Sequence, residues 1–251
     1  MGLIGGSLGY HILKILSAHG KTRSAGSHAC AGKGKLETLL GPPFWREIEG
    51  KTVVDFGCGA GADAVEIAER GARNVIGIDI QESLLGIGRR YAELAGVSER
   101  CVFSTCATAS ADVIVTIDSF EHFADPATTL QTMRRMLNPG GCVIASFGPT
   151  WYHPLGGHLF SVFPWAHLLF TEDALMRWRS DFKTDSATRF GEVAGGLNQM
   201  TIKQFELLIE QSPFTFERLE LIPIRKLRRL MNRLTREVTT ARIRCKLVAR
   251  D

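Results

Sequence analysis

The sequence predicts an α/β domain in which helices cover both faces of a doubly wound, seven-stranded, mostly parallel sheet. Short apolar runs alternate with helical patterns from residue 51 to residue 147, as expected of repeated β-α-β units. The apolar runs lack the polar–apolar alternation of a half-exposed strand, so both faces of the sheet should be covered. Two later β-like segments raise the expected number of strands from five to seven.

The expected elements follow from hydrophobic pattern and from turn residues. Strands are predicted at residues 52–56, 74–80, 101–105, 112–117, 142–147, 215–224 and 239–249. Helices are predicted at residues 62–70, 82–95, 126–137 and 201–211. A basic amphipathic helix packed on the sheet is predicted within residues 224–236, where leucines recur at helical spacing among six Lys and Arg side chains.

Two segments depart from the β-α alternation. Residues 1–50 form an expected helical and flexible lead-in, with a Gly-, Ser- and Lys-rich stretch at 19–35. Residues 51–251 then form the main domain. Within it, an aromatic-, His- and Gly-rich stretch at about 148–200 is expected to be an insert after the fifth strand, which caps the carboxyl edge of the sheet.

Bulk composition is that of a globular protein. The chain has 251 residues, of which 45% are hydrophobic and 22% charged, and its net charge is +4. No apolar run is long enough to span a bilayer. The six cysteines are scattered and form no Cys-x-x-Cys pair, which favours reduced thiols and a cytoplasmic location.

A glycine-rich turn provides the strongest functional signal. Gly57, Gly59 and Gly61 follow the first predicted strand and precede the first predicted helix. Glycine is needed where the backbone turns sharply and a ligand approaches it closely. Asp79 ends the next predicted strand, where an acidic side chain can accept hydrogen bonds from both hydroxyls of a ribose. The pattern therefore predicts a nucleoside-containing cofactor.

The same turn also satisfies a dinucleotide fingerprint, Gly57-x-Gly59-x-x-Ala62, so a nicotinamide-dependent oxidoreductase is an alternative. Asp55 favours S-adenosylmethionine instead. It lies within the strand, two residues before the first glycine, where it could hold the ammonium group of that ligand.

The chain resembles class I S-adenosylmethionine-dependent methyltransferases over about residues 50–150, and more faintly to its end. The resemblance implies a Rossmann-like methyltransferase fold with S-adenosylmethionine as cofactor. It rests on five motifs: Asp55-x-Gly57-x-Gly59-x-Gly61, Gly77-Ile-Asp79, Asp112-Val-Ile-Val, Glu121-His122 and Leu137-Asn-Pro-Gly-Gly141.

One position departs from the family. Many relatives carry an aspartate after strand three that contacts the adenine amine, and Cys106 occupies that place here. Adenine recognition is then expected to rest on backbone groups and on apolar stacking with Ile80. Asp118, at the end of strand four, is a further candidate contact because it should lie beside the transferred methyl group.

Asp118, Glu121 and His122 share one face if this segment makes a helical turn. Their oxygen and nitrogen atoms suit a divalent metal, and the segment resembles the Glu-x-x-Glu-His site of ubiquinone-biosynthesis O-methyltransferases and small-RNA 2′-O-methyltransferases. His167 best matches the later histidine ligand of those families, although His153 and His158 are also available. The metal is not favoured, because Asp118-x-x-Glu121 is also a capping-box pattern.

The stretch from Trp151 to Asn198 is expected to form the acceptor pocket. His122 and His153 are the candidate general bases, since histidine titrates near neutral pH. Trp151 and Tyr152 could stack on an aromatic acceptor. Arg189, Glu192 and Asn198 form either a substrate loop or a plain surface loop.

The resemblance thus implies a methyltransferase that acts on a small molecule, with oxygen as the favoured acceptor atom and carbon or nitrogen left open. An RNA 2′-O-methyltransferase and a non-catalytic module that binds S-adenosylmethionine are the alternatives. Nucleic acid is not favoured as a partner, and the basic segment at 225–236 allows only a weak contact with a membrane surface. The sequence leaves the oligomeric state open.

Overall fold

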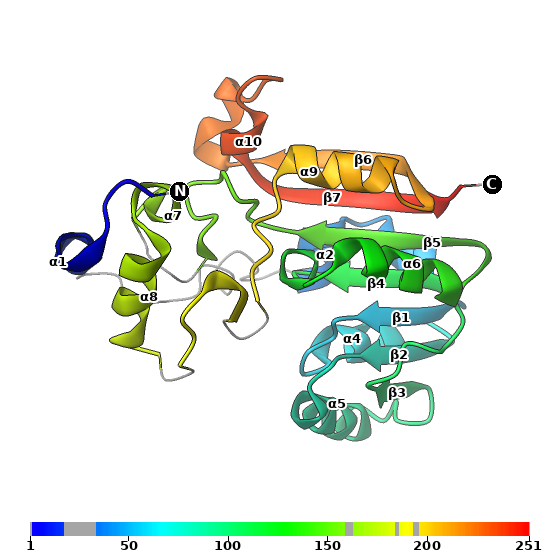
Figure 1. The fold of residues 1–251 in the computed structure, drawn as a ribbon. Helices are drawn as coiled ribbons and strands as arrows, with labels where there is room; N and C mark the ends of the chain where they lie inside the picture. The colour runs from blue at the N-terminus through cyan, green and yellow to red at the C-terminus, as the bar shows by residue number, and fades with distance from the viewer. Residues whose placement is uncertain (1, 18–33, 159–162, 184–185, 193–195, 251) are drawn as a thin grey trace.

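The computed structural model describes residues 2–17, 34–158, 163–183, 186–192 and 196–250. Its centre is a seven-stranded sheet in the order β3-β2-β1-β4-β5-β7-β6 (Figure 1), so the predicted fold class is confirmed. Only β7 runs antiparallel to its neighbours β5 and β6. The strands are β1 Thr52–Phe56, β2 Asn74–Ile78, β3 Cys101–Ser104, β4 Ala111–Ile117, β5 Leu137–Phe147, β6 Phe214–Pro223 and β7 Thr240–Ala249.

Most strand boundaries fall within two residues of the prediction, and β5 is the exception. It begins at Leu137 rather than at residue 142, because Leu137 pairs with Ala111 of β4. The register then shifts, and regular pairing resumes between Val113 and Cys142. Pro139 and Gly140 therefore lie within an irregular start of the strand.

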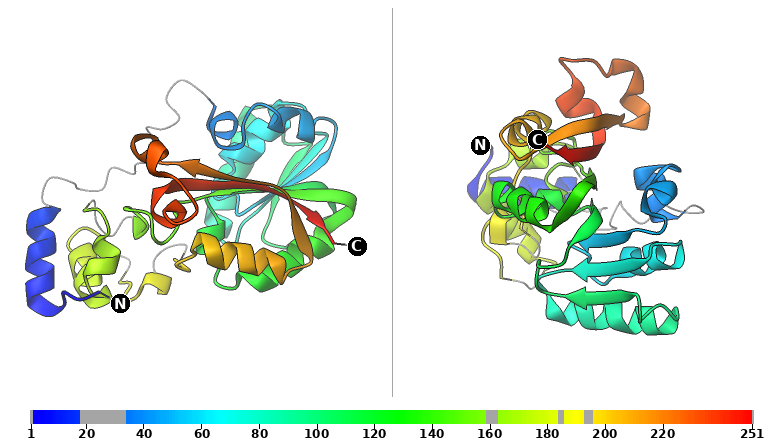
Figure 2. Two further views of the ribbon diagram at one scale, coloured as in Figure 1. Left: turned by 90° about the horizontal axis from the view of Figure 1, so that it is seen from above. Right: turned by 90° about the vertical axis from the view of Figure 1, so that its right-hand side faces the viewer.

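Helices cover both faces of the sheet, as the end-on view of Figure 2 shows. One apolar cluster joins α2, α3, α4 and α5 to one face, and a second joins α6 and α9 to the other. Burial on both sides explains the uninterrupted apolar runs of the central strands. These helices are α2 Lys35–Leu40, α3 Phe44–Ile48, α4 Ala62–Glu69, α5 Glu82–Leu94, α6 Pro126–Met136 and α9 Ile202–Glu210.

A third apolar cluster lies beyond the carboxyl ends of the parallel strands (Figure 1). We call it the cap; it combines α1 Gly6–Leu16, α7 Ala166–Leu169 and α8 Glu172–Ser180. The first helix packs on α8, and the Tyr10 hydroxyl donates to Asp181 over 2.8 Å. Most of the glycine-rich stretch predicted to be flexible, residues 18–33, lies outside the described residues.

The prediction of a basic amphipathic helix within residues 224–236 is wrong. The chain forms a short 3-10 helix, η4 Arg225–Leu230, then a turn, and then α10 Arg236–Thr239. Asn232 interrupts the helical path, since its side-chain oxygen accepts hydrogen bonds from the backbone of Leu234 and Thr235 over 2.8 and 3.2 Å. No residue of η4 is buried, so its leucines do not pack on the sheet as predicted.

No helix of the described residues is long and apolar enough to cross a membrane.

Phe205 of α9 offers a test of the second apolar cluster. Its ring is fully buried and lies 5.1 Å from Phe120 and 4.9 Å from Phe147. We expect Phe205→Ala to lower the free energy of unfolding by about 3–5 kcal/mol, because it removes a ring from a packed site. Leu207→Ala on the same helix is the matched control, since Leu207 is 48% exposed, and should cost about 1 kcal/mol or less. Urea unfolding measures both, and equal losses would contradict the packing.

Candidate active site

The glycine turn lies where the strand order reverses, between β1 and β4. Gly57, Gly59 and Gly61 have φ values of 80°, 53° and 76°, a region that disfavours other residues. A Cβ atom at Gly57 would lie 2.5 Å from Ser119, and one at Gly61 would lie 2.4 Å from Phe103. A Cβ atom at Gly59 would meet no atom within 4 Å. Two glycines therefore serve close packing, whereas Gly59 borders open space that a ligand can enter.

Asp79 follows β2, and its carboxylate is fixed by backbone donors. The N–H of Gly59 donates to Oδ2 over 2.9 Å, and the N–H of Gln81 donates to Oδ1 over 3.0 Å. Each oxygen keeps a second acceptor position, which suits the two hydroxyls of a ribose. The neighbouring Ile80 is 90% exposed, and Cys106, after β3, is also exposed.

Asp55 of β1 is a buried acid that lacks a full set of partners. The residue is 2% exposed, and its Oδ2 atom has no hydrogen-bond partner. Burial, together with the nearby charge of Asp63, raises the pKa of Asp55 to about 8. A buried acceptor without a partner costs free energy, which a ligand ammonium group would recover.

Lys35 is the residue that sequence reasoning missed on the cofactor side. It begins α2, and its Nζ atom lies 2.6 Å from Oδ2 of Asp63 in the first turn of α4. Its charge also acts on Asp55. Lys35 therefore brings a cation to the glycine turn from 28 residues away along the sequence. The sequence carried no signal for this, because the residue belongs to the stretch predicted to be a flexible lead-in.

Asp118, a candidate cofactor contact and metal ligand, forms an ion pair with an arginine. Its Oδ1 atom lies 2.5 Å from a guanidinium nitrogen of Arg242 on β7. The backbone of Asp118 is left-handed, with φ of 50°, and its N–H donates to Ser146 of β5. The carboxylate therefore joins the ends of β4 and β7, and it is absent from the group of potential metal ligands that the described residues contain.

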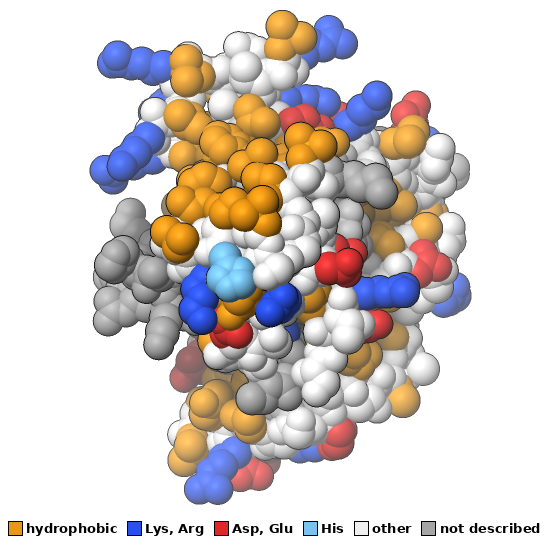
Figure 3. Space-filling view, turned by 60° about the vertical axis from the view of Figure 1, so that its left-hand side comes forward, with side chains coloured by type: hydrophobic (Ala, Val, Ile, Leu, Met, Phe, Trp, Pro, Cys, Tyr) orange, Lys and Arg blue, Asp and Glu red, His pale blue; other side chains and the backbone are white. Residues whose placement is uncertain are grey.

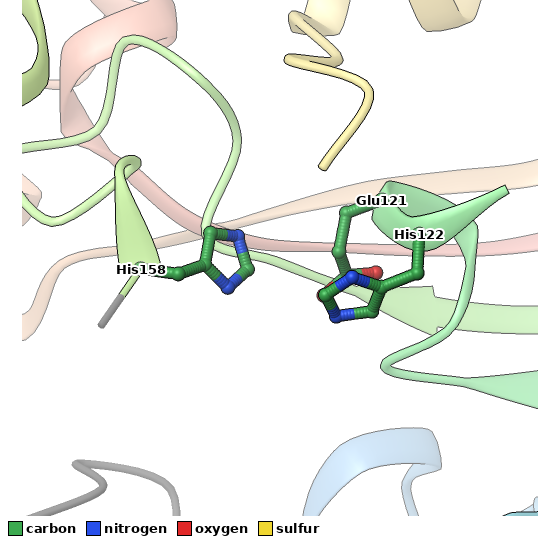
Figure 4. A group of neighbouring side chains, drawn as sticks. All are labelled: Glu121, His122 and His158. Carbon is green, nitrogen blue, oxygen red and sulfur yellow. The ribbon is translucent and has the colours of Figure 1, made fainter. Parts of the chain in front are cut away.

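Three other side chains do converge after β4 and β5 (Figure 4). Glu121 and His122 belong to the 3-10 helix η1 Phe120–His122, and His158 comes from the loop after β5. One ligand atom from each residue lies within 4.8 Å of the other two. The imidazole rings of His122 and His158 are 5.7 Å apart. We call these three residues the carboxylate–imidazole cluster.

The hydrogen bonds of the cluster leave its ligand atoms free. Nδ1 of His122 lies 2.6 Å from the carbonyl of Gly196, so Nδ1 carries the proton and Nε2 carries a lone pair. Nε2 of His158 and Oε2 of Glu121 are buried without a partner. Burial raises the pKa of Glu121 to about 8 and lowers the pKa of His158 to about 4. The buried atoms of Glu121 and His158 thus lack partners, which a cation or an acceptor hydroxyl would supply.

The structure gives the other predicted histidines structural contacts. Nδ1 of His153 accepts the N–H of Leu155 over 2.9 Å, and burial lowers the pKa of His153 to about 4. Nε2 of His167 lies 2.6 Å from the carbonyl of Trp151, and the ring of His167 packs on that indole. His158, not His167, therefore accompanies Glu121 and His122. The Trp151 indole packs, partly buried, against the apolar cluster of the cap.

Asn198 supports η1 from the end of the segment that follows β5. Its side-chain amide donates to the carbonyls of Phe120 and Phe123 over 2.8 and 3.0 Å. Its backbone N–H donates to the carbonyl of Glu121 over 2.9 Å. Glu192, by contrast, closes a local turn by accepting from Thr188. Asn198 is therefore a positioning residue for the carboxylate–imidazole cluster.

These features define a class of nucleoside-binding α/β enzymes. The sheet is mostly parallel, the glycine turn lies where the strand order reverses, and an acid follows the second strand. A family model described as a methyltransferase domain matches residues 33–233. The chain belongs to this family, and it is a class I S-adenosylmethionine-dependent methyltransferase.

Curated relatives match a part of the chain. Ubiquinone biosynthesis O-methyltransferase of Acinetobacter baumannii is 36% identical over 106 residues, which are 39% of this chain and 44% of the relative. The enzyme of that name from Pseudomonas aeruginosa is 34% identical over 105 residues, which are 39% and 45% of the two chains. The matched region thus spans less than half the length of these relatives.

Solved structures resemble the fold over a greater length. An S-adenosylmethionine-dependent methyltransferase from Mesorhizobium loti has a TM-score of 0.53 at 20% identity, over 82% of this chain and 95% of its own. The PH0226 protein from Pyrococcus horikoshii has a TM-score of 0.53 at 17% identity, over 96% and 98%. At these identities the likeness concerns the fold.

Variants of the glycine turn can test whether Gly61 serves packing and Gly59 serves ligand access. We expect Gly61→Ala to lower the free energy of unfolding by about 2–4 kcal/mol, through backbone strain and the clash with Phe103. Gly59→Ala should cost only about 1–2 kcal/mol of strain, yet weaken binding of S-adenosylhomocysteine about tenfold or more. Urea unfolding and calorimetry measure the two effects.

Gly86→Ala is the control for these variants, because Gly86 lies on α5 with negative φ and open space around it. It should leave affinity unchanged and stability equal or slightly higher. Full affinity in Gly59→Ala would contradict the assignment of Gly59 to the ligand side.

Proposed function

We propose that this methyltransferase transfers the methyl group to a hydroxyl of a small-molecule acceptor. The observation that carries the proposal is the carboxylate–imidazole cluster of Glu121, His122 and His158. It gathers acceptor atoms without partners at the carboxyl edge of the sheet, beside the cofactor turn. A hydroxyl must lose its proton during methyl transfer, so such a cluster is suited to binding and deprotonating it.

We propose that Asp55, Asp79, Lys35 and the glycine turn hold S-adenosylmethionine. The open space at Gly59 and the orphaned oxygen of Asp55 fit this ligand. Asp79 would accept the ribose hydroxyls, and Asp55 the ammonium group. Lys35 would pair with the carboxylate of the ligand. The bound cofactor supplies an electrophilic methyl group, so the protein needs mainly to orient the acceptor and exclude water.

The cluster also fits a divalent cation, since it offers one carboxyl group and two imidazole rings. Such a cation would lower the pKa of an acceptor hydroxyl that binds to it. Two neighbours orient the ligands: Gly196 fixes the tautomer of His122, and the carbonyl of Pro149 accepts from His158. We therefore propose Glu121, His122 and His158 as its ligands, in place of the set with Asp118 and His167.

The curated relatives support oxygen as the acceptor atom, because both are ubiquinone biosynthesis O-methyltransferases. The five described cysteines are all free thiols, which supports a cytoplasmic location.

The role of Lys35 can be tested with two ligands. S-adenosylhomocysteine carries the amino-acid group, whereas methylthioadenosine keeps the adenosine and the thioether but lacks that group. We expect Lys35→Met to weaken binding of S-adenosylhomocysteine about tenfold, because one charge-assisted contact is lost. Binding of methylthioadenosine should change less than about threefold. Calorimetry on the purified chain measures both affinities.

Lys51→Met serves as the control, since Lys51 is also exposed and lies near the start of β1. It should leave both affinities unchanged. An equal loss for the two ligands in Lys35→Met would show that Lys35 supports the turn without contacting the carboxylate.

The acceptor chemistry can be tested with cofactor labelled at its methyl group. Incubation with a host extract, followed by mass identification, should yield a labelled methyl ether. We expect Glu121→Gln and His158→Asn each to lower turnover at least about a hundredfold while leaving affinity for S-adenosylhomocysteine within about twofold. Excess chelator should abolish turnover, and manganese or cobalt should restore it.

The proposal has two parts, a general base and a bound cation, and metal analysis of the purified chain tests the second. Ether formation that persists in excess chelator would rule out the cation and would leave the general base in place. A labelled product methylated only at carbon or nitrogen would overturn O-methylation.

A further inference from the structure

The segment between β6 and β7 carries a charged surface that the methyl-transfer site does not use. This segment protrudes beyond the sheet at the top of Figure 1 and consists of η4, the following turn and α10. We call residues 225–238 the protruding segment. Its five exposed cations are Arg225, Lys226, Arg228, Arg229 and Arg233.

None of these five cations forms an ion pair with a carboxylate of the described residues. The sole acid of the segment, Glu237, is occupied elsewhere, because it accepts the backbone N–H groups of Ile202 and Lys203 over 3.0 and 2.9 Å. Arg236 turns inward and pairs with Glu206 of α9. Within the part of the chain that the structure describes, the outward-facing charge of the segment is therefore positive and has no paired carboxylate.

Large apolar side chains are exposed among these cations. Leu234 is 93% exposed, Leu230 is 60% exposed and Val238 is 36% exposed. Apolar side chains that gather on an exposed surface often mark a site of contact with a protein or a membrane. The backbone here is firmly held, since the Asn232 side chain accepts two N–H groups and Ile224 donates to Thr239. The leucines are thus presented on an ordered scaffold.

Exposed apolar side chains also occur on and beside the cap. Leu3 is 90% exposed, and its N–H donates to Leu169, which is 40% exposed. Trp165 is 37% exposed, and its indole N–H donates to the carbonyl of Tyr152, itself 42% exposed. Figure 3, which brings this side of the molecule forward, shows hydrophobic side chains gathered over its upper part, with Lys and Arg side chains beside and above them.

We propose that the protruding segment docks the protein on the surface of an anionic phospholipid bilayer. Exposed leucines can insert between acyl chains while surrounding Arg and Lys side chains pair with anionic headgroups. Trp165 and Tyr152 suit the headgroup region, since each has an apolar ring and a polar group. Two other partners fit this surface less well. A second copy of the chain would bring like charges together. A nucleic acid would pair with the cations but would leave the leucines in water. This inference is independent of the acceptor proposed above.

Vesicle flotation tests the proposal on the full chain. We expect binding to mixed vesicles of phosphatidylcholine and phosphatidylglycerol, little binding to phosphatidylcholine alone, and weaker binding at high salt. The charge variant R228Q/R229Q/R233Q and the apolar variant L230S/L234S should each weaken binding to the mixed vesicles about tenfold or more.

The matched control R90Q/L94S changes an exposed cation and an exposed leucine on α5, at the opposite end of the sheet (Figure 1), and should bind like the unmodified chain. Affinity for S-adenosylhomocysteine shows that each variant is folded. The proposal is overturned if the unmodified chain ignores the mixed vesicles, or if only the control weakens binding. It is also overturned if the protruding segment binds duplex DNA or RNA and not vesicles.

Discussion

Two buried carboxyl groups constrain this molecule more than any other feature. Asp55 and Glu121 lie at the ends of neighbouring central strands, and each keeps one oxygen without a hydrogen-bond partner. Burial holds the pKa of both groups near 8, because their charged forms are poorly solvated there. Each acid therefore costs stability in the free protein and favours a positively charged or proton-donating ligand. The sheet thus positions two sites that favour such ligands next to each other along one edge.

Strands and loops position different groups along this edge. The glycine turn, Asp55 and Asp79 are fixed by neighbouring parallel strands, so backbone geometry positions them. The carboxylate–imidazole cluster depends on loops: His158 comes from the segment after β5, and Gly196 and Asn198 reach η1 from the far end of the same segment. In the function proposed above, the strands therefore hold the cofactor and the loops hold the acceptor.

Local patterns predicted the cofactor half of the fold closely. Residues from β1 to α5 follow one another in space as they do in sequence, so hydrophobic period and glycine placement fix both the elements and the position of Asp79. The carboxylate–imidazole cluster could not be predicted from sequence, because its geometry depends on the paths of loops. No spacing rule distinguishes His158 from His167. Lys35 and Arg242 were missed for a related reason, since each reaches the site from an element distant in sequence. The amphipathic pattern at residues 224–236 failed because the Asn232 turn outweighed helical periodicity.

The ion pair between Asp118 and Arg242 joins the turn after β4 to β7, the one antiparallel strand of the described sheet. β7 thus fixes the position of a carboxylate at the carboxyl edge of the parallel strands, although it lies away from the glycine turn. β7 also lies inside the sheet, between β5 and β6, and its Ile243, Cys245 and Leu247 belong to the second apolar cluster. A chain shortened before residue 242 would therefore lose this ion pair and expose part of the core, so one hairpin serves both the stability of the sheet and the order of its carboxyl edge.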